Sequence, residues 1–229
     1  MIEKLVSEVE WNDALAGLPA FPLPFGPVIL LSPHPDDESL AAGGLLAALV
    51  QEQMSVTVVA ITDGDAAYEA SGDSKLGELR RQEQIAALAI LGVPEDQVVR
   101  LHLPDRYVHA HEAELAERLI GLLRMAGATA TLIAPWRGDF HSDHEAVGRA
   151  AEIAAAETGS TLVRWFWWSW HRRTVEELTV LPLKRFHLKT AWLALKLAAL
   201  AEYRSQLGED AILPDSLLVP AQRRFEVFA

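Results

Sequence analysis

The sequence predicts an α/β protein built on an open, mostly parallel sheet with helices on both faces. In the first 170 residues, short apolar or β-branched runs alternate with longer stretches rich in Leu, Ala and charged residues. Strands that alternate with helices favour a parallel sheet, because each helix returns the chain across one face of the sheet. The chain has 229 residues, half of them hydrophobic, so we expect one domain over residues 1–229 with a sizeable core.

Each predicted strand is a short apolar or β-branched run. The strands are expected over residues 28–32, 55–62, 98–103, 129–134 and 163–170. Helices are expected over residues 38–53, 76–91, 112–125 and 142–156, and Gly92-Val93-Pro94 is a stop signal for the second of them. Residues 174–183 resist assignment. Residues 185–207 resemble a long helix, and a tail with Pro214 and Pro220 is expected to wrap the surface.

Charge and composition exclude several classes of partner and site. The net charge is −12, whereas a nucleic-acid surface or an anionic membrane calls for Lys and Arg. Cysteine is absent, so any metal must be held by His and carboxylates. Met1–Leu5 lacks the layout of a signal peptide, and the longest apolar stretch, residues 40–50, is too short to span a bilayer. We therefore expect a cytoplasmic protein that binds neither nucleic acid nor membrane.

Acidic residues and histidines crowd the carboxyl ends of the predicted strands, where open α/β sheets bind their ligands. The segments concerned are residues 33–38, 63–65, 104–106 and 136–144. This edge of the sheet is therefore the expected site.

The first cluster is His34-Pro35-Asp36-Asp37, between a buried strand and a helix. One aspartate could simply cap the helix, since free N–H groups and the helix dipole favour it there. Capping does not account for two aspartates and a histidine together. We therefore interpret the cluster as functional.

The second cluster is His141-Ser142-Asp143-His144-Glu145. Ser142 and Glu145 match a capping box, which predicts that the helix begins at Asp143 and has His144 in its first turn. A well-capped helix gives no reason for two histidines at this edge of the sheet.

The two clusters together offer His34, Asp37 and His144 as zinc ligands. Three protein ligands and one open position are typical of a catalytic zinc. Fe²⁺ could also occupy such a site, because the types of ligand separate the two metals poorly.

The remaining residues of the clusters suggest hydrolysis. Asp36 can accept a proton from water and return it to a leaving nitrogen. His141, if protonated, can stabilise an oxyanion, and Asp143 can hold the His141 ring and favour its charged form.

Several motifs resemble the PIG-L/LmbE-like zinc-dependent deacetylases. They are Pro33-His34-Pro35-Asp36-Asp37-Glu38, then Arg80 and Glu83 before Leu91-Gly92, then His141-Ser142-Asp143-His144, with a weaker echo at Tyr203-Arg204-Ser205-Gln206. The resemblance covers residues 28–150. It implies a Rossmann-like fold with a twisted sheet and hydrolysis of N-acetyl groups on glucosamine-containing molecules. Proteins of this kind include hexamers and other oligomers, so a homo-oligomer is compatible with the sequence, although it reveals no interface.

The resemblance also implies roles for individual residues. It supports His34, Asp37 and His144 as metal ligands and Asp36 as the general base, with His141 and Asp143 at the matching catalytic positions. It implies that Arg80 contacts substrate and that Asp105 touches sugar hydroxyls. The family commonly has Pro where Ser142 stands, and often His where Tyr203 precedes Arg204. The first change leaves the chemistry intact because serine can cap a helix, whereas the second puts a role for the late segment in doubt.

Aromatic residues near the predicted site give weaker signals. Trp136 is the better candidate to stack on a sugar. The run 165–170, with four tryptophans and one phenylalanine, is expected to fill the core on both sides of a strand, with a smaller chance that Trp170 forms a sugar-binding wall.

The leading hypothesis is thus a zinc-dependent hydrolase that removes an N-acetyl group from an N-acetylglucosamine-type amino sugar or its conjugate. The alternative within enzymes is an amidase for a larger thiol or antibiotic-type conjugate with the same metal site. A nucleotide-binding protein is disfavoured, because no Gly-x-Gly-x-x-Gly follows the first strand. A metal-binding protein without catalysis would be expected to lack the base, yet Asp36 is present.

Overall fold

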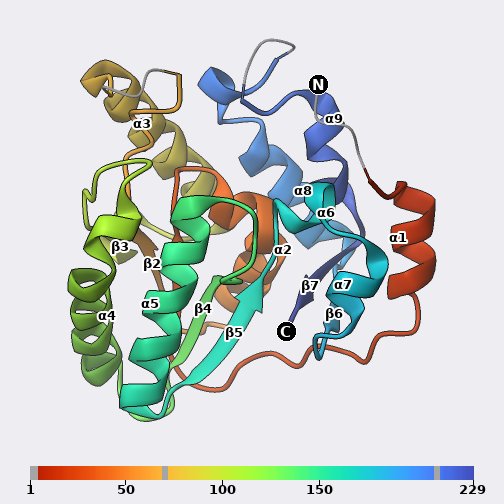
Figure 1. Cartoon of the computed structure of the whole chain (residues 1–229), viewed down its shortest axis with the longest axis horizontal. Coiled ribbons are helices and arrows are strands. Elements are labelled where there is room, and N and C mark those ends of the chain that lie inside the picture. Colours follow the sequence, from red (N-terminus) through yellow and green to blue (C-terminus); the bar gives the residue numbers. More distant parts are fainter. Residues whose placement is uncertain (1–4, 69–71, 209–211) are drawn as a thin grey trace.

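A five-stranded parallel sheet forms the centre of the computed structural model, which describes residues 5–68, 72–208 and 212–229 (Figure 1). The strand order is β3-β2-β1-β4-β5. The strands are β1 (Val28–Ser32), β2 (Val56–Ala60), β3 (Val98–Arg100), β4 (Thr131–Pro135) and β5 (Thr161–Trp165). The predicted α/β class is confirmed. Residues 1–4, which carry most of the N-terminal prediction, lie outside the described residues.

Helices cover both faces of this sheet, as predicted. Side chains at alternate positions of the strands pack into two separate cores. One core holds Val28 and Leu30 with helices α2 (Asp37–Gln51), α3 (Ser74–Leu91) and α8 (Thr190–Leu200). The other holds Ile29 and Leu31 with helices α4 (Glu112–Ala126) and α5 (Ser142–Thr158).

The chain adds strands on one side of β1 first and then on the other side. The chain moves from β1 outward to β2 and β3, then crosses back to β4 on the other side of β1. Because β1 and β4 are neighbouring parallel strands, the turns that follow them lie side by side. This is the crevice in which doubly wound sheets bind ligands, and both histidine clusters emerge there.

The C-terminal third departs from the prediction. The strand expected over residues 163–170 ends at Trp165, and a turn leads into the short helix α6 (Ser169–Arg172). The helix expected over residues 185–207 is shorter in the structure. The segment begins with the strand β6 (Lys184–His187), and the helix α8 covers only residues 190–200. β6 pairs in antiparallel fashion with β7 (Phe225–Phe228), which is buried rather than a surface tail.

The remaining elements are short. They are the helices α1 (Glu8–Leu15), α7 (Val175–Thr179) and α9 (Asp215–Leu218), and the 3-10 segments Glu95–Gln97, Val108–His111, Arg204–Gln206 and Val219–Gln222. Within the described ranges, every helix lacks the length and apolarity that a membrane span requires.

The C-terminal strand is tied to α2 by a buried carboxylate. Ala42 has non-helical angles, with φ −139°, which kinks α2. The Glu226 carboxylate of β7 accepts hydrogen bonds from the backbone N–H groups of Gly44 and Leu45, both at 2.8 Å, and from Lys196 Nζ at 2.7 Å. These contacts hold the part of α2 that follows its kink.

Candidate active site

The turn between β1 and α2 holds an aspartate in a strained conformation. Asp36 has φ 148°, a region rarely adopted by residues other than glycine, and such outliers persist where the surroundings enforce them. It occupies the N-cap position of α2, yet its side chain makes no capping hydrogen bond to any described residue. Capping therefore does not explain Asp36. Asp37 accepts a hydrogen bond from the backbone N–H of His34 at 2.9 Å, which closes the turn.

The turn between β4 and α5 is capped by a histidine, so the predicted capping box is wrong. His141 occupies the N-cap position, and its Nδ1 accepts a hydrogen bond from the backbone N–H of Asp143 at 3.3 Å. Ser142 is the first helical residue. His144 follows in the first turn of α5, as expected, and is fully buried.

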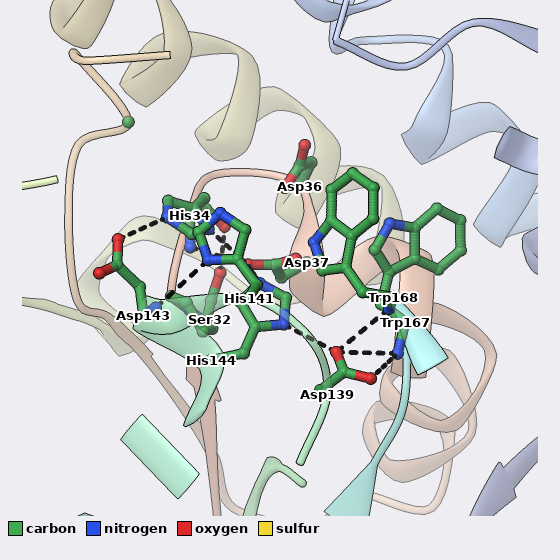
Figure 2. A network of polar contacts seen from close by, with 12 residues as sticks. Ser32, His34, Asp36, Asp37, Asp139, His141, Asp143, His144, Trp167 and Trp168 are labelled. Atoms are coloured by element: carbon green, nitrogen blue, oxygen red, sulfur yellow. Dashed lines mark hydrogen bonds and ion pairs between the residues drawn. The ribbon is translucent and has the colours of Figure 1, made fainter. Parts of the chain in front are cut away.

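One oxygen of Asp37 lies close to a ring nitrogen of a histidine from each turn (Figure 2). Asp37 Oδ2 lies 3.2 Å from His34 Nδ1 and 3.2 Å from His144 Nε2. Two ligands about 2.0–2.1 Å from a tetrahedral metal are about 3.3 Å apart. His144 Nε2 is buried and has no hydrogen-bond partner among the described residues, so it is left for an electrophile. The types of donor atom and the spacing of these two pairs suit metal binding.

A third imidazole borders the same space. One ring nitrogen from each of His34, His141 and His144 lies within 4.8 Å of the other two. Asp105 and Asp143 form a similar group with His34. Both predicted clusters and the predicted Asp105 are thus brought together.

Burial and neighbouring charges shift the pKa values of this site in opposite directions. Burial lowers the pKa of His144, but Asp37 and Asp139 outweigh it and raise that pKa to about 9. The pKa of Asp37 is lowered because His144 and His34 overcome the effect of its burial. Burial and the charge of Asp37 raise the pKa of Asp36 well above its usual range, and Arg80 opposes this rise.

His141 has a pKa near 3, because burial and the charges of His34 and His144 disfavour its protonated form. The sequence suggested a protonated His141 held by Asp143. The Asp143 carboxylate instead lies 3.2 Å from His34 Nε2 and accepts hydrogen bonds from the backbone of Arg106 at 2.8 Å and Val108 at 3.2 Å. Its contact with His141 is through its backbone N–H.

The site opens into a small cavity of about 110 Å³. Its polar lining comes from both turns, from helix α3 and from the loop after β3. The lining residues are His34, Asp36, Asp37, Leu40, Ala67, Arg80, Asp105, Arg106, His141, Trp167, Trp168, Ile212 and Leu213. Typical small-molecule pockets enclose about 300–1,000 Å³, so this cavity suits one end of a ligand.

Residues 29–155 match the protein family described as PIG-L: GlcNAc-PI de-N-acetylase. The match covers more than half of the chain and includes both histidine turns. The chain belongs to the PIG-L family.

Two curated relatives bear the name 1D-myo-inositol 2-acetamido-2-deoxy-alpha-D-glucopyranoside deacetylase. The protein from Nocardioides sp. is 29% identical over 161 residues, covering 56% of this chain and 53% of that protein. The protein from Corynebacterium glutamicum is 32% identical over 168 residues, covering 60% and 54%. The chain thus spans about half the length of these relatives.

A solved structure supports the fold. The zinc inhibited form of teicoplanin deacetylase Orf2 superposes with a TM-score of 0.68 and 20% identity, covering 88% of this chain and 96% of that chain. At this identity the likeness concerns the fold alone.

The late motif Tyr203-Arg204-Ser205-Gln206 contacts the first histidine turn and helix α3. Gln206 Oε1 accepts a hydrogen bond from Arg80 Nη2 at 2.6 Å, and Gln206 Nε2 donates to the carbonyl of Pro35 at 2.7 Å. Ser205 donates to Glu83 through its backbone and its hydroxyl, both at 2.7 Å. The segment therefore supports the strained turn and Arg80, which is itself buried and also donates to the carbonyl of Gly64 at 2.8 Å.

The aromatic residues differ from the prediction. Trp136 packs on Phe166 and beneath the guanidinium of Arg173, and it does not belong to the described lining of the cavity. Trp168 lines the cavity and stacks on His141, with ring centroids 6.1 Å apart and an interplanar angle of 22°. A strand over residues 163–170 predicts no separate role for Trp168, whereas the strand ends at Trp165 in the structure.

Proposed function

We propose that this chain is a zinc-dependent hydrolase that removes an N-acetyl group from an N-acetylglucosamine-type amino sugar or its conjugate. The single observation that carries the proposal is the meeting of His34 Nδ1 and His144 Nε2 at one oxygen of Asp37, with distances suited to a tetrahedral metal. Membership of the PIG-L family and the names of the two relatives support the acetamido sugar as substrate.

Asp36 is the proposed general base. Zinc, or Fe²⁺ in its place, supplies Lewis-acid activation of water and of the acyl carbonyl. Asp36 takes a proton from the attacking water and returns it to the leaving nitrogen. Its raised pKa suits this transfer, because a carboxyl group that holds its proton more strongly accepts it more readily.

His141 acts in this proposal as a neutral hydrogen-bond donor. Its Nδ1 accepts the N–H of Asp143, so the proton of the neutral ring resides on Nε2. That N–H can stabilise the oxyanion as the acyl carbon becomes tetrahedral. Its low pKa favours this neutral form of the ring.

The cavity constrains how the substrate binds. A volume of about 110 Å³ accommodates the acetamido end and leaves the rest of the conjugate at the mouth. We assign Asp105 to a sugar hydroxyl, with one oxygen facing His34 at 3.3 Å and the other held by the N–H of Ala66 at 2.9 Å. Trp168 replaces Trp136 as the residue that stacks on the sugar.

The test is acetate release from a panel of N-acetylglucosaminides, using protein stripped of metal and then reloaded with Zn²⁺ or Fe²⁺. We expect release only after reloading, with rates that vary with the group attached to the sugar. Stoichiometric metal without acetate release from any sugar would favour the alternative, an amidase for larger thiol or antibiotic-type conjugates. Failure to bind metal would contradict both.

The pH profile tests the position of Arg80. The charge of Arg80, whose Nη2 lies 3.6 Å from Asp36 Oδ2, lowers the pKa of Asp36. In Arg80→Gln we expect that pKa to rise. The base must be deprotonated to act, so the acidic limb of the kcat/KM profile should move to higher pH.

The adjacent Arg81 provides the matched control. It pairs with Glu78 at the surface, at 2.9 Å, and does not reach the cavity. Arg81→Gln should leave the acidic limb in place. An unmoved limb in Arg80→Gln, or an equal shift in both variants, would contradict this role.

A further inference from the structure

Asp139 is a buried carboxylate to which the sequence analysis assigned no role. It is fully buried in the loop between β4 and α5. Its oxygens accept hydrogen bonds from the backbone N–H groups of Trp167 at 3.0 Å, Trp168 at 3.2 Å and Ser169 at 3.0 Å, and from the Ser169 hydroxyl at 2.6 Å (Figure 2). The turn after β5 therefore holds this carboxylate in one orientation.

The fifth partner of Asp139 is the proposed metal ligand His144. Asp139 Oδ2 lies 2.9 Å from His144 Nδ1. Since a carboxylate oxygen accepts, Nδ1 must carry the proton of a neutral His144 ring, which leaves the lone pair on Nε2. That Nε2 is the buried atom without a hydrogen-bond partner among the described residues, and it faces Asp37.

We propose that Asp139 is a positioning residue that sets the tautomer and the ring orientation of His144 for metal binding. The inference rests on the metal site of the proposed function. Histidines that bind metals commonly donate their other N–H to a carboxylate, and loss of that partner weakens metal affinity by about 10–100-fold. The same carboxylate holds the turn of Trp167 and Trp168, which form part of the cavity wall, so it connects the metal ligand with the substrate side of the site.

The first measurement is the zinc Kd, by competition with a chelator, of wild type and Asp139→Asn. Asparagine keeps the size of the side chain, but its NH2 group must face either an N–H of the turn or the N–H of His144. We expect the Kd to rise by about 10–100-fold. Glu112→Gln is the control, because Glu112 is a carboxylate that accepts hydrogen bonds from Arg149 and contacts no proposed metal ligand. Its Kd should stay within about twofold of wild type, well below that expected rise.

A double-mutant cycle separates an effect through His144 from a general loss of structure. In a His144→Ala background, titrated at zinc concentrations high enough to measure its much weaker binding, Asp139→Asn should raise the zinc Kd little further. Equal losses in both backgrounds, or an unchanged Kd in Asp139→Asn, would overturn the proposal. Should Asp139→Asn fail to fold, Ser169→Ala removes one donor that orients the carboxylate. That variant should weaken binding in the same direction, and an unchanged Kd would then count against the proposal.

A second readout does not require metal. The Nδ1–H resonance of His144 in metal-free protein should be protected from exchange in wild type and lose that protection in Asp139→Asn. Equal protection in both proteins would overturn the positioning role. If wild type bound no metal, the proposed function would fail, and the resonance would still decide whether Asp139 holds His144.

Discussion

Replacement of Asp36 by asparagine is expected to lower kcat/KM for deacetylation by roughly 10²–10⁴-fold, the range that general acid–base groups contribute. Asparagine retains the shape of the side chain but cannot accept the proton of the attacking water. Asp36 lines the cavity, and its strained backbone is held from outside by Arg80 and Gln206 through the carbonyl of Pro35. We therefore expect the turn to survive the substitution and zinc to stay bound. Acetate release and zinc content, measured on the same sample, test this.

Asp63→Asn is the matched control for this variant. Asp63 lies at the same edge of the sheet but pairs with His102, at 2.7 Å, and is not part of the described cavity lining. Its substitution should leave kcat/KM close to that of wild type. Joint loss of zinc and activity in Asp36→Asn would instead show that Asp36 binds the metal.

The fold of residues 28–165 could be predicted because its signals are local, whereas helix α1 (Glu8–Leu15) was not predicted. The run 28–32 matches β1 residue for residue, and Gly92 ends α3 in the left-handed conformation, with φ 88°. The C-terminal third could not be predicted in this way. Lys184 pairs with Phe228, far along the chain, so neither β6 nor β7 is stable by itself, and a window of sequence contains only one of the two partners.

The site was predictable in its residues but not in their contacts. Histidines and aspartates after β1 and β4 meet because those strands are neighbours, which the alternation of strands and helices only suggests. Whether Asp143 faces His141 or His34 depends on the backbone near Arg106 and Val108, whose N–H groups hold that carboxylate. The spacing of residues in the sequence does not predict how the backbone runs there. Asp139 was missed for the same reason, since its partners belong to a different turn.

Replacement of Asp37 by alanine is expected to abolish both stoichiometric zinc binding and acetate release. Asp37 Oδ2 is the atom that lies 3.2 Å from both His34 Nδ1 and His144 Nε2, so its removal leaves two imidazoles without the oxygen they share. A catalytic zinc normally keeps three protein ligands. The loss of affinity should therefore exceed the 10–100-fold effect of an outer partner such as Asp139. Zinc titration followed by acetate release at saturating zinc measures both effects.

The contrast between the two neighbouring aspartates is the decisive result. Asp36→Asn should retain zinc and lose turnover, whereas Asp37→Ala should lose both, although the two residues are adjacent in the sequence. Thermal unfolding of metal-free Asp37→Ala is the control. Removal of the acceptor for the His34 N–H lowers the free energy of unfolding by about 1–3 kcal/mol, and the variant must remain folded for the comparison to hold. Zinc bound at wild-type affinity to folded Asp37→Ala would exclude Asp37 as a ligand and move the third donor to His141, the remaining imidazole beside His34 and His144.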